Sequence, residues 1–149
     1  MERVPVESRW VNERWQVSAA VPEPAGTAAG AERVSDEAGR EWWFWHGFEL
    51  ELHRSEGEGY WLNVTSPEPR VFVRWRQDED RAVPQYVTVS YNEAARWLDG
   101  GEQVDGVPMA APIHAWLVPW VAENYRPEPR RKVRRNDPFK DGAFRRDRE

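Results

Sequence analysis

The sequence predicts an α+β fold in which a curled antiparallel β-sheet, or a small barrel, is joined by two C-terminal helices and an extended basic tail. Three observations lead to this prediction. Short apolar–polar alternations separated by turn residues fill the first ninety residues, which is typical of an antiparallel meander. Apolar residues then recur at spacings of three and four, as in amphipathic helices. After Tyr125 the periodicity ends among prolines and charges.

The composition indicates one small domain with an aromatic core. Of the 149 residues, 40% are hydrophobic and 13% are aromatic, and ten are tryptophans. The core must therefore be built from few, large side chains. Because a buried indole N–H needs a partner, we expect some tryptophans at an interface. Residues 1–125 are expected to form a single α+β domain, and residues 126–149 a basic extended tail.

Signals for disulfides, secretion and membrane insertion are all missing from the sequence. Without cysteine the chain has no disulfide and no thiolate metal site, which favours a cytoplasmic protein. The first residues show no apolar run behind a basic one, so we expect no signal peptide. No apolar segment approaches the ~20 residues of a membrane helix, so we expect no membrane span.

The net charge of −5 conceals an asymmetry between the body and the tail. Residues 126–149 carry ten basic and five acidic side chains, whereas residues 1–125 carry eleven basic and twenty-one acidic ones. An acidic body argues against general nucleic-acid binding. The tail could instead fold back on its own body or dock on an acidic partner.

Short strands are expected in the first part of the chain. The first lies around Val4 and Val6, and the second covers residues 14–21, where two prolines end it. Residues 25–39 are small, rich in glycine and alanine, and acidic. We therefore expect a surface loop there.

Glu41–Arg54 is the most apolar segment and is expected to be the central strand. Both of its faces are aromatic before Gly47. Beyond Gly47 the apolar residues Phe48, Leu50 and Leu52 alternate with the polar residues Glu49, Glu51 and His53. This is the pattern of a strand with one buried face. Gly57 and Gly59 indicate a turn, and Tyr60–Ser66 then reads as the returning strand.

Two more strands and two helices complete the expected fold. Arg70–Gln77 alternates well, and Gln85–Val89 follows a charged loop. Ser90 and Glu93 have the spacing of a capping box, so a helix should begin there and end before the glycine pair at 100–101.

The last helix follows a short extended segment at Val104–Val107. Pro112 suits a first helical position. An apolar stripe then comprises Ile113, Trp116, Leu117, Trp120 and Val121. Pro119 lies inside this helix and should kink it, because proline removes a backbone hydrogen bond.

The histidines do not predict a metal site. His46 and His53 are seven residues apart and face opposite sides of a regular strand, unless a bulge at Gly47 brings them together. Glu49 and Glu51 share the face of His53 and are metal-ligand types. A solvated strand face is the simpler interpretation, so we expect neither a metal nor a cofactor.

No catalytic residues are predicted either. The carboxylates at 56–58 and 78–80 lie in turn-like segments, whereas a general acid needs a sheltered pocket. Ser90 is expected to cap a helix and has no nucleophile-elbow context. The glycine pair at 100–101 follows a helix, whereas a phosphate-binding loop precedes one.

The aromatic excess and the tail indicate protein binding. Trp, Phe and Arg residues dominate interface hot spots. The predicted contact residues are Trp42, Trp43 and Trp45, the tail anchors Phe139 and Phe144, and the arginines Arg130, Arg131, Arg134 and Arg135.

Two other function classes compete with this hypothesis. In the first, the chain is a small-molecule-binding β-barrel or an enzyme, with a pocket formed by Trp42, Trp61 and Trp75 around His46 or His53. In the second, the tail is a nucleic-acid arm. We rank it last, because nucleic-acid affinity scales with the phosphates that are neutralised and the body is acidic.

Several segments together resemble a known family by their order and spacing. They are Arg14–Pro22, Leu50–Arg54, Tyr60–Val73, Val87–Ser90, Glu93–Glu102, Val107–Ala110 and Trp116–Tyr125, followed by a basic tail with proline and phenylalanine. The chain resembles, from about Val4 to Phe139, the bacterial domain-of-unknown-function family 3305.

The resemblance implies a small cytoplasmic protein encoded near molybdenum-dependent formate dehydrogenase genes. It supplies no catalytic residues. With the aromatic excess, it leads us to expect a non-catalytic accessory or assembly subunit without a cofactor. The implied partner is a larger redox enzyme subunit, such as a molybdenum-dependent formate dehydrogenase.

Overall fold

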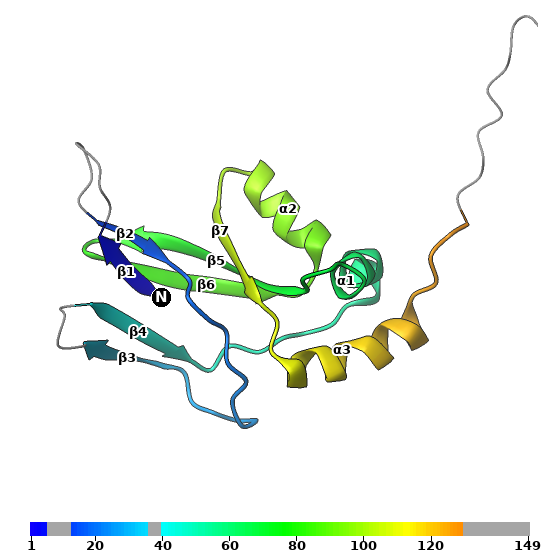
Figure 1. Ribbon diagram of the computed structural model, residues 1–149, viewed down its shortest axis with the longest axis horizontal. Coiled ribbons are helices and arrows are strands. Elements are labelled where there is room, and N and C mark those ends of the chain that lie inside the picture. Colours follow the sequence, from blue (N-terminus) through cyan, green and yellow to red (C-terminus); the bar gives the residue numbers. More distant parts are fainter. Residues whose placement is uncertain (6–12, 36–39, 130–149) are drawn as a thin grey trace, which may run out of the picture.

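Two separate antiparallel sheets form the β part of the fold (Figure 1). The computed structural model describes residues 1–5, 13–35 and 40–129. The first sheet has the order β2-β1-β4-β3 and consists of β1 (Glu2–Pro5), β2 (Glu13–Gln16), β3 (Gly30–Ser35) and β4 (Glu41–His46). The second has the order β6-β5-β7 and consists of β5 (Arg70–Asp78), β6 (Arg81–Thr88) and β7 (Gln103–Pro108). The α+β prediction is confirmed. The single curled sheet or barrel was wrong, because the edge strands of one sheet form no ladder with the other.

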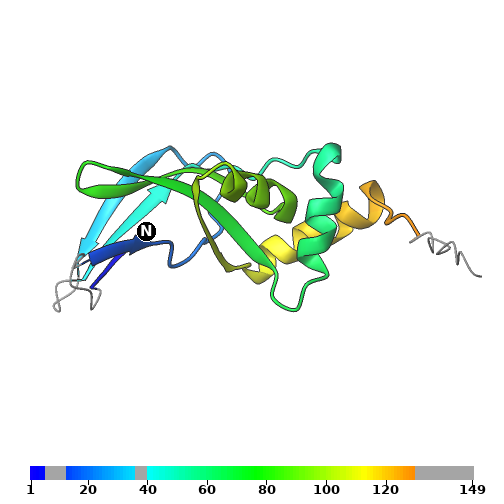
Figure 2. The same cartoon turned by 90° about the horizontal axis from the view of Figure 1, so that it is seen from above.

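Helices gather at one end of the molecule, as Figures 1 and 2 show. They are the short 3₁₀-helix η1 (Arg54–Glu56), α1 (Gly57–Val64), α2 (Tyr91–Asp99) and α3 (Ala111–Asn124). The first sheet lies at the other end, beside the turn of the β5–β6 hairpin. Within the described ranges, none of the helices has both the length and the apolar content that a membrane crossing needs.

Two clusters of buried side chains hold these layers together. The first lies between the second sheet and the helices and comprises Tyr60, Val71, Val89, Val107, Leu117 and Val121. The second lies between the two sheets and comprises Met1, Trp15, Trp75 and Ala82. Val17 packs against both clusters, so the segment after β2 connects the two cores.

Helix α1 replaces a predicted glycine turn and the predicted strand Tyr60–Ser66. Gly59 permits close packing of α1 against the start of α2, because a Cβ atom at this position would overlap Ser90 Oγ. Burial of Tyr60 and Asn63, three residues apart, defines the inner face of the helix. The strand prediction was wrong because these tertiary contacts outweigh the β-propensity of a short aromatic run.

Strand β3 lies inside the predicted loop 25–39. It pairs with the whole of β4, from Gly30 opposite His46 to Ser35 opposite Glu41. Ladder hydrogen bonds use only the backbone, so small and acidic residues can form an edge strand beside an aromatic one. The loop prediction was wrong for these six residues.

The predicted central strand ends at His46, and residues 47–53 are not part of any ladder. Leu50 and Leu52 nevertheless pack against the first cluster, between the second sheet and the helices. The Tyr60 hydroxyl accepts a hydrogen bond from the His53 N–H at 3.0 Å and donates one to the Glu51 carbonyl at 3.5 Å. The alternation therefore identified Leu50 and Leu52 as core-facing, but it was wrong for Phe48, which is exposed, and the conclusion that the backbone is a strand was also wrong. The predicted second strand also ends early, at Gln16.

The later elements agree with the sequence. Val71, Val73 and Trp75 are buried on one face of β5, as its alternation predicted. The helices predicted from Ser90 and from Pro112 are confirmed as α2 and α3. Strand β6 begins earlier than predicted and includes a proline, which an edge strand tolerates.

The capping box at the start of α2 includes an additional residue. The Glu93 N–H donates to Ser90 Oγ at 3.1 Å, as predicted. The Glu93 carboxylate does not return to the Ser90 N–H. It accepts a hydrogen bond from Thr88 Oγ1 at 2.9 Å, and Thr88 Oγ1 in turn accepts from the Ser90 N–H at 3.1 Å. Thr88 therefore links the end of β6 to the first turn of α2.

Candidate partner-binding groove

An apolar groove, which we call the β4 groove, lies along β4. It has a volume of about 780 Å³ and is lined chiefly by residues 17–27 and 42–50 and by Ile113 and Trp116 of α3. A few residues of β5 and β6 complete the lining. These segments are far apart in sequence, so the groove exists only in the folded chain.

Large apolar side chains around the β4 groove remain exposed to solvent. The exposed fractions are 70% for Val21, 50% for Phe44, 38% for Phe48 and 48% for Trp116. Single exposed apolar residues are common, but a group of them around one groove is typical of a binding surface. The β4 groove is therefore the candidate functional site of the described chain.

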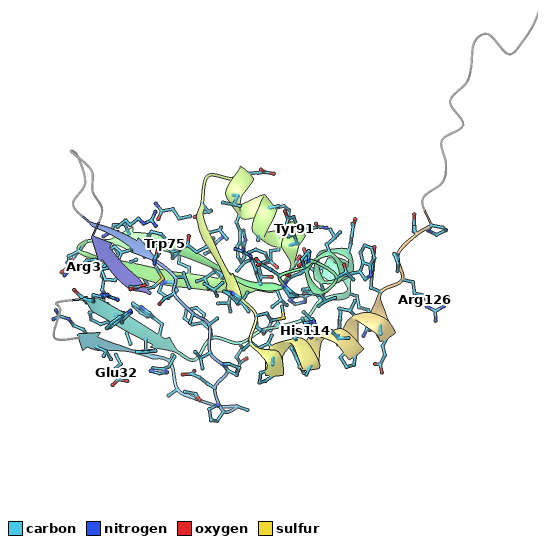
Figure 3. All side chains as sticks on the ribbon, in the orientation of Figure 1. Arg3, Glu32, Trp75, Tyr91, His114 and Arg126 are labelled. Atoms are coloured by element: carbon cyan, nitrogen blue, oxygen red, sulfur yellow. The ribbon has the colours of Figure 1, made fainter. Side chains whose placement is uncertain are left out.

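An ion pair holds residues 17–27 against β4. His46 Nδ1 contacts Glu23 Oε1, and the Gly47 N–H donates to Glu23 Oε2 at 3.2 Å. His46 Nε2 lies 3.8 Å from Glu32 Oε2, and Figure 3 shows Glu32 projecting from the outer side of β3. The hydrogen bond to Glu23 raises the pKa of His46, and the same bond lowers the pKa of Glu23.

Gly47 allows the chain to leave β4 and form this wall. Its φ is +87°, a region that favours glycine. A Cβ atom at this position would lie 2.6 Å from the Ala29 Cα atom, which is closer than atoms of this kind approach. The position is thus restricted to glycine both by conformation and by contact.

The tryptophan cluster of β4 has two roles in the structure. Trp42, Trp43 and Trp45 all line the β4 groove. Trp43 and Trp45 also pack against the core between the sheets, where the Arg81 guanidinium lies 4.6 Å and 5.2 Å from their ring centroids. That Trp43 and Trp45 bind a partner stays a prediction, and their visible contacts are within the chain.

Glu41 anchors the same face of β4. Its carboxylate accepts a hydrogen bond from Trp43 Nε1 at 2.7 Å. It also pairs with Arg3 at 2.7 Å and with Arg33 at 3.4 Å. This buried acid therefore orients one tryptophan and joins three strands of the first sheet.

The residues of the alternative aromatic pocket are distributed over the molecule. Trp42 and His46 line the β4 groove. Trp75 is buried between the sheets, and the ring of Trp61 packs on that of Tyr125 with 6.0 Å between centroids. His53 is exposed and lies 3.8 Å from Glu51. The structure thus brings together two of the five residues in this groove.

The tail residues named from the sequence lie outside the described residues. They are Arg130, Arg131, Arg134, Arg135, Phe139 and Phe144.

Sequence reasoning missed several residues of the β4 groove, among them Val21, Glu23, Phe44, Phe48 and Trp116. Trp116 had a usable signal. The apolar stripe of α3 is wider than the single buried face, which carries Leu117 and Val121, so part of it must be exposed. The sequence carried no signal that Val21 and Phe48 line one groove, since only the fold brings their two segments together.

Other polar clusters have structural roles. Ser90 Oγ is fully buried, accepts a hydrogen bond from the Glu93 N–H and donates one to Glu56 Oε2 at 2.6 Å. Glu56 also pairs with Arg96. In the part of the chain that the structure describes, no three His, Asp or Glu side chains are grouped to hold a metal ion.

Fold and site together define a small α+β protein of two antiparallel sheets with an apolar groove bounded by an aromatic strand. A family model described as "Protein of unknown function (DUF3305)" matches residues 1–134, so the chain belongs to this family. The search of curated proteins and the search of solved structures each gave no match.

Proposed function

We propose that the chain is a non-catalytic accessory or assembly protein that binds a larger protein through the β4 groove. The observation that carries this proposal is the exposure of Val21, Phe44, Phe48 and Trp116 around one groove. Burying such side chains is worth roughly 1.5–3 kcal/mol each. A partner that covers the groove would recover this free energy.

The chemistry of the groove suits a protein partner. Aromatic anchors near the centre of an interface contribute most of the binding energy, and here Phe44, Phe48 and Trp116 are already accessible. The predicted contacts through the tail anchors Phe139 and Phe144 are part of the same proposal.

The class of partner comes from the family resemblance. We propose a larger redox enzyme subunit in the cytoplasm, such as a molybdenum-dependent formate dehydrogenase. The chain would bring no cofactor of its own and would act by binding during assembly or in the finished complex.

A pull-down with matched variants tests this proposal. The full-length chain, tagged at its C-terminus, is used as bait in lysate of its native cells, and a redox enzyme recovered in stoichiometric amount is purified for affinity measurement. Phe44→Ser should weaken binding roughly thirtyfold, because a hot-spot residue contributes about 2 kcal/mol.

The control is Leu98→Ser on α2. Leu98 is 56% exposed, similar to Phe44 at 50%, but does not line the β4 groove. Equal affinity of the Phe44→Ser and wild-type proteins would refute the role of the groove. Loss of binding in the Leu98→Ser protein alone would place the interface on α2 instead.

A small-molecule function is the second candidate, and the size of the groove favours it. Its volume of about 780 Å³ lies within the range of ligand pockets, and both Trp42 and His46 line it. A ligand screen by thermal shift separates the two proposals. A compound whose stabilising effect is lost in the Trp42→Ala protein would favour the ligand-binding function.

A further inference from the structure

We propose that the chain's own C-terminal segment, residues 130–149, occupies the β4 groove in the free protein. This proposal adds a second occupant to the same site. The occupancy itself does not depend on the proposed function. Only its consequence does, namely that a partner must displace the segment before it can bind. Three observations support it: the charge of the groove, the chemistry of the segment, and the place where the described chain ends.

The β4 groove is apolar with an acidic margin. Glu23 and Glu49 line it, and among the described lining residues there is neither lysine nor arginine. Glu23 is paired with His46, whose pKa this hydrogen bond raises, so the charge of Glu23 is balanced while His46 is protonated and Glu49 supplies the remaining negative charge of the lining. Glu32 lies beside His46 and adds a further negative charge. The groove is therefore complementary to a segment that is basic and carries apolar anchors.

The C-terminal segment has this complementary chemistry. Residues 130–149 include nine basic and four acidic side chains, in a chain whose residues 1–125 are strongly acidic. Phe139 and Phe144 are its only aromatic residues, and each is followed directly by a basic residue. Two aromatic anchors flanked by cations match an aromatic groove with a carboxylate margin.

The described chain ends within reach of the groove. Tyr125 is fixed to the body by its ring contact with Trp61. Trp116 lines the groove, and the eight residues from there to the end of α3 span ~12 Å. Residues 125–129 add at most ~17 Å if fully extended. The fifteen residues from 130 to 144 extend up to ~50 Å, so Phe144 can return to the groove.

Covalent attachment favours this occupant over a free peptide. A tethered segment of suitable length has an effective concentration on the order of millimolar at its site. Weak contacts by Phe139 and Phe144 therefore suffice to keep the groove filled. A partner would have to bind more tightly than this internal competitor, and the released basic segment would then be free to contact it.

Photo-crosslinking of the full-length chain tests the proposal. Phe139 and Phe144 are replaced, one at a time, by the photoreactive analogue benzoylphenylalanine, and crosslinked peptides are identified by mass spectrometry. We expect crosslinks to residues 17–27, to residues 44–50 or to Trp116. The yield should fall several-fold in the Glu49→Gln protein, which keeps the His46–Glu23 pair, and a photoprobe at Leu98 should give no crosslink to the groove.

Mixing isotope-labelled and unlabelled protein separates contacts within a chain from contacts between copies. Crosslinks only between copies would overturn the proposal in favour of a second copy's segment. Crosslinks to other surfaces, or none, would also overturn it. The experiment uses the free protein, so its failure leaves the proposed partner binding untouched.

Binding of a hydrophobic dye gives a second measurement. The Phe139→Ser, Phe144→Ser protein should bind the dye several-fold more strongly than wild type, because the groove would be uncovered. Phe44→Ser added to this variant should reverse much of the increase. Equal dye binding by wild type and the double variant, with unchanged circular dichroism, would contradict the proposal.

Discussion

Asn63 shows how one buried side chain can determine the ends of three elements. It is 2% exposed, and its amide N–H groups donate to the carbonyls of Arg70 at 2.7 Å and Val89 at 2.8 Å. Its side-chain oxygen accepts from the Arg70 N–H at 2.9 Å. The amide thus takes the place of a ladder partner, and α1 is joined to the start of β5 and the end of β6.

Asn63→Leu should destabilise the protein by about 2–4 kcal/mol, because the substitution leaves one buried and two partly buried backbone groups without their Asn63 partner. The free energy of unfolding in urea provides the measurement. Asn124→Leu is the matched control, since the Asn124 amide makes one hydrogen bond, to the Trp120 carbonyl at 2.9 Å. Equal losses in the two variants would contradict the proposed role of Asn63.

The His46–Glu23 pair should make the attachment of residues 17–27 depend on pH. The pKa of His46 is raised above 6.5, so its contribution is complete below pH 6.5 and is lost as pH rises through the folded value. The pKa of Glu23 is lowered below 4.5, so its contribution is complete above pH 4.5 and is lost as pH falls through the folded value. The pair therefore contributes fully between pH 4.5 and pH 6.5, where both side chains are charged.

An NMR titration of the His46 ring checks this expectation. Glu23→Gln should return the His46 midpoint toward 6.5, because the hydrogen bond to Glu23 is the largest cause of the raised pKa. Glu32→Gln should move the midpoint in the same direction by less, since Glu32 contributes less to the shift. A midpoint that does not move in the Glu23→Gln protein would show that the pair is absent in solution.

At the scale of elements, close helix packing depends on a single glycine. α1 and α2 meet where Gly59 faces Ser90, whose side chain is fully buried and engaged with Glu56. The contact has no space for a methyl group. It therefore sets the distance between α1 and the start of α2.

Gly59→Ala should destabilise the protein by about 1–3 kcal/mol, although alanine in a helix usually gains about 0.5–1 kcal/mol over glycine. The steric overlap with Ser90 Oγ outweighs this gain. Gly30→Ala is a suitable control, because nothing lies within 4 Å of a Cβ atom there. The midpoints of thermal unfolding compare the two proteins, and a stabilised Gly59→Ala variant would disprove the tight contact.

At the scale of the whole molecule, the two sheets share no backbone ladder among the described residues, and packed side chains connect them. Trp15 comes from the first sheet and Trp75 and Ala82 from the second, and they form the core between the sheets. Arg81, at the start of β6, adds cation–π contacts to two tryptophans of β4. The relative placement of the two sheets depends on this core and on the Arg81 contacts. The shape of the β4 groove depends on that placement.

Arg81→Met should cost about 1–2 kcal/mol, the size of a partly desolvated cation–π contact, while keeping the aliphatic packing of the side chain. Unfolding followed by tryptophan fluorescence measures both the stability and the environment of Trp43 and Trp45. Arg76→Met provides the control on the exposed part of β5. An Arg81→Met protein as stable as the Arg76→Met protein would refute the coupling of the sheets through Arg81.

The sequence predicted an element well where neighbouring residues form it, and poorly where residues far apart in the chain form it. The alternation in Arg70–Gln77 identified β5 and its buried residues, because one face of that strand packs on a core along its length. The spacing of Ser90 and Glu93 identified the start of α2, because a cap is formed by neighbours in sequence. The strand prediction for Tyr60–Ser66 was wrong, because the helical conformation there depends on contacts with residues far along the chain.

The sequence by itself determined the α+β class, the later strands, α2 and α3, and the aromatic character of β4. These properties depend on local periodicity, caps and composition. The tertiary structure alone decided that the strands form two sheets, and that Trp43 and Trp45 pack between them. It also decided that Val21, Phe44, Phe48 and Trp116 surround one groove. Those properties depend on side chains from distant segments meeting, which no local pattern records.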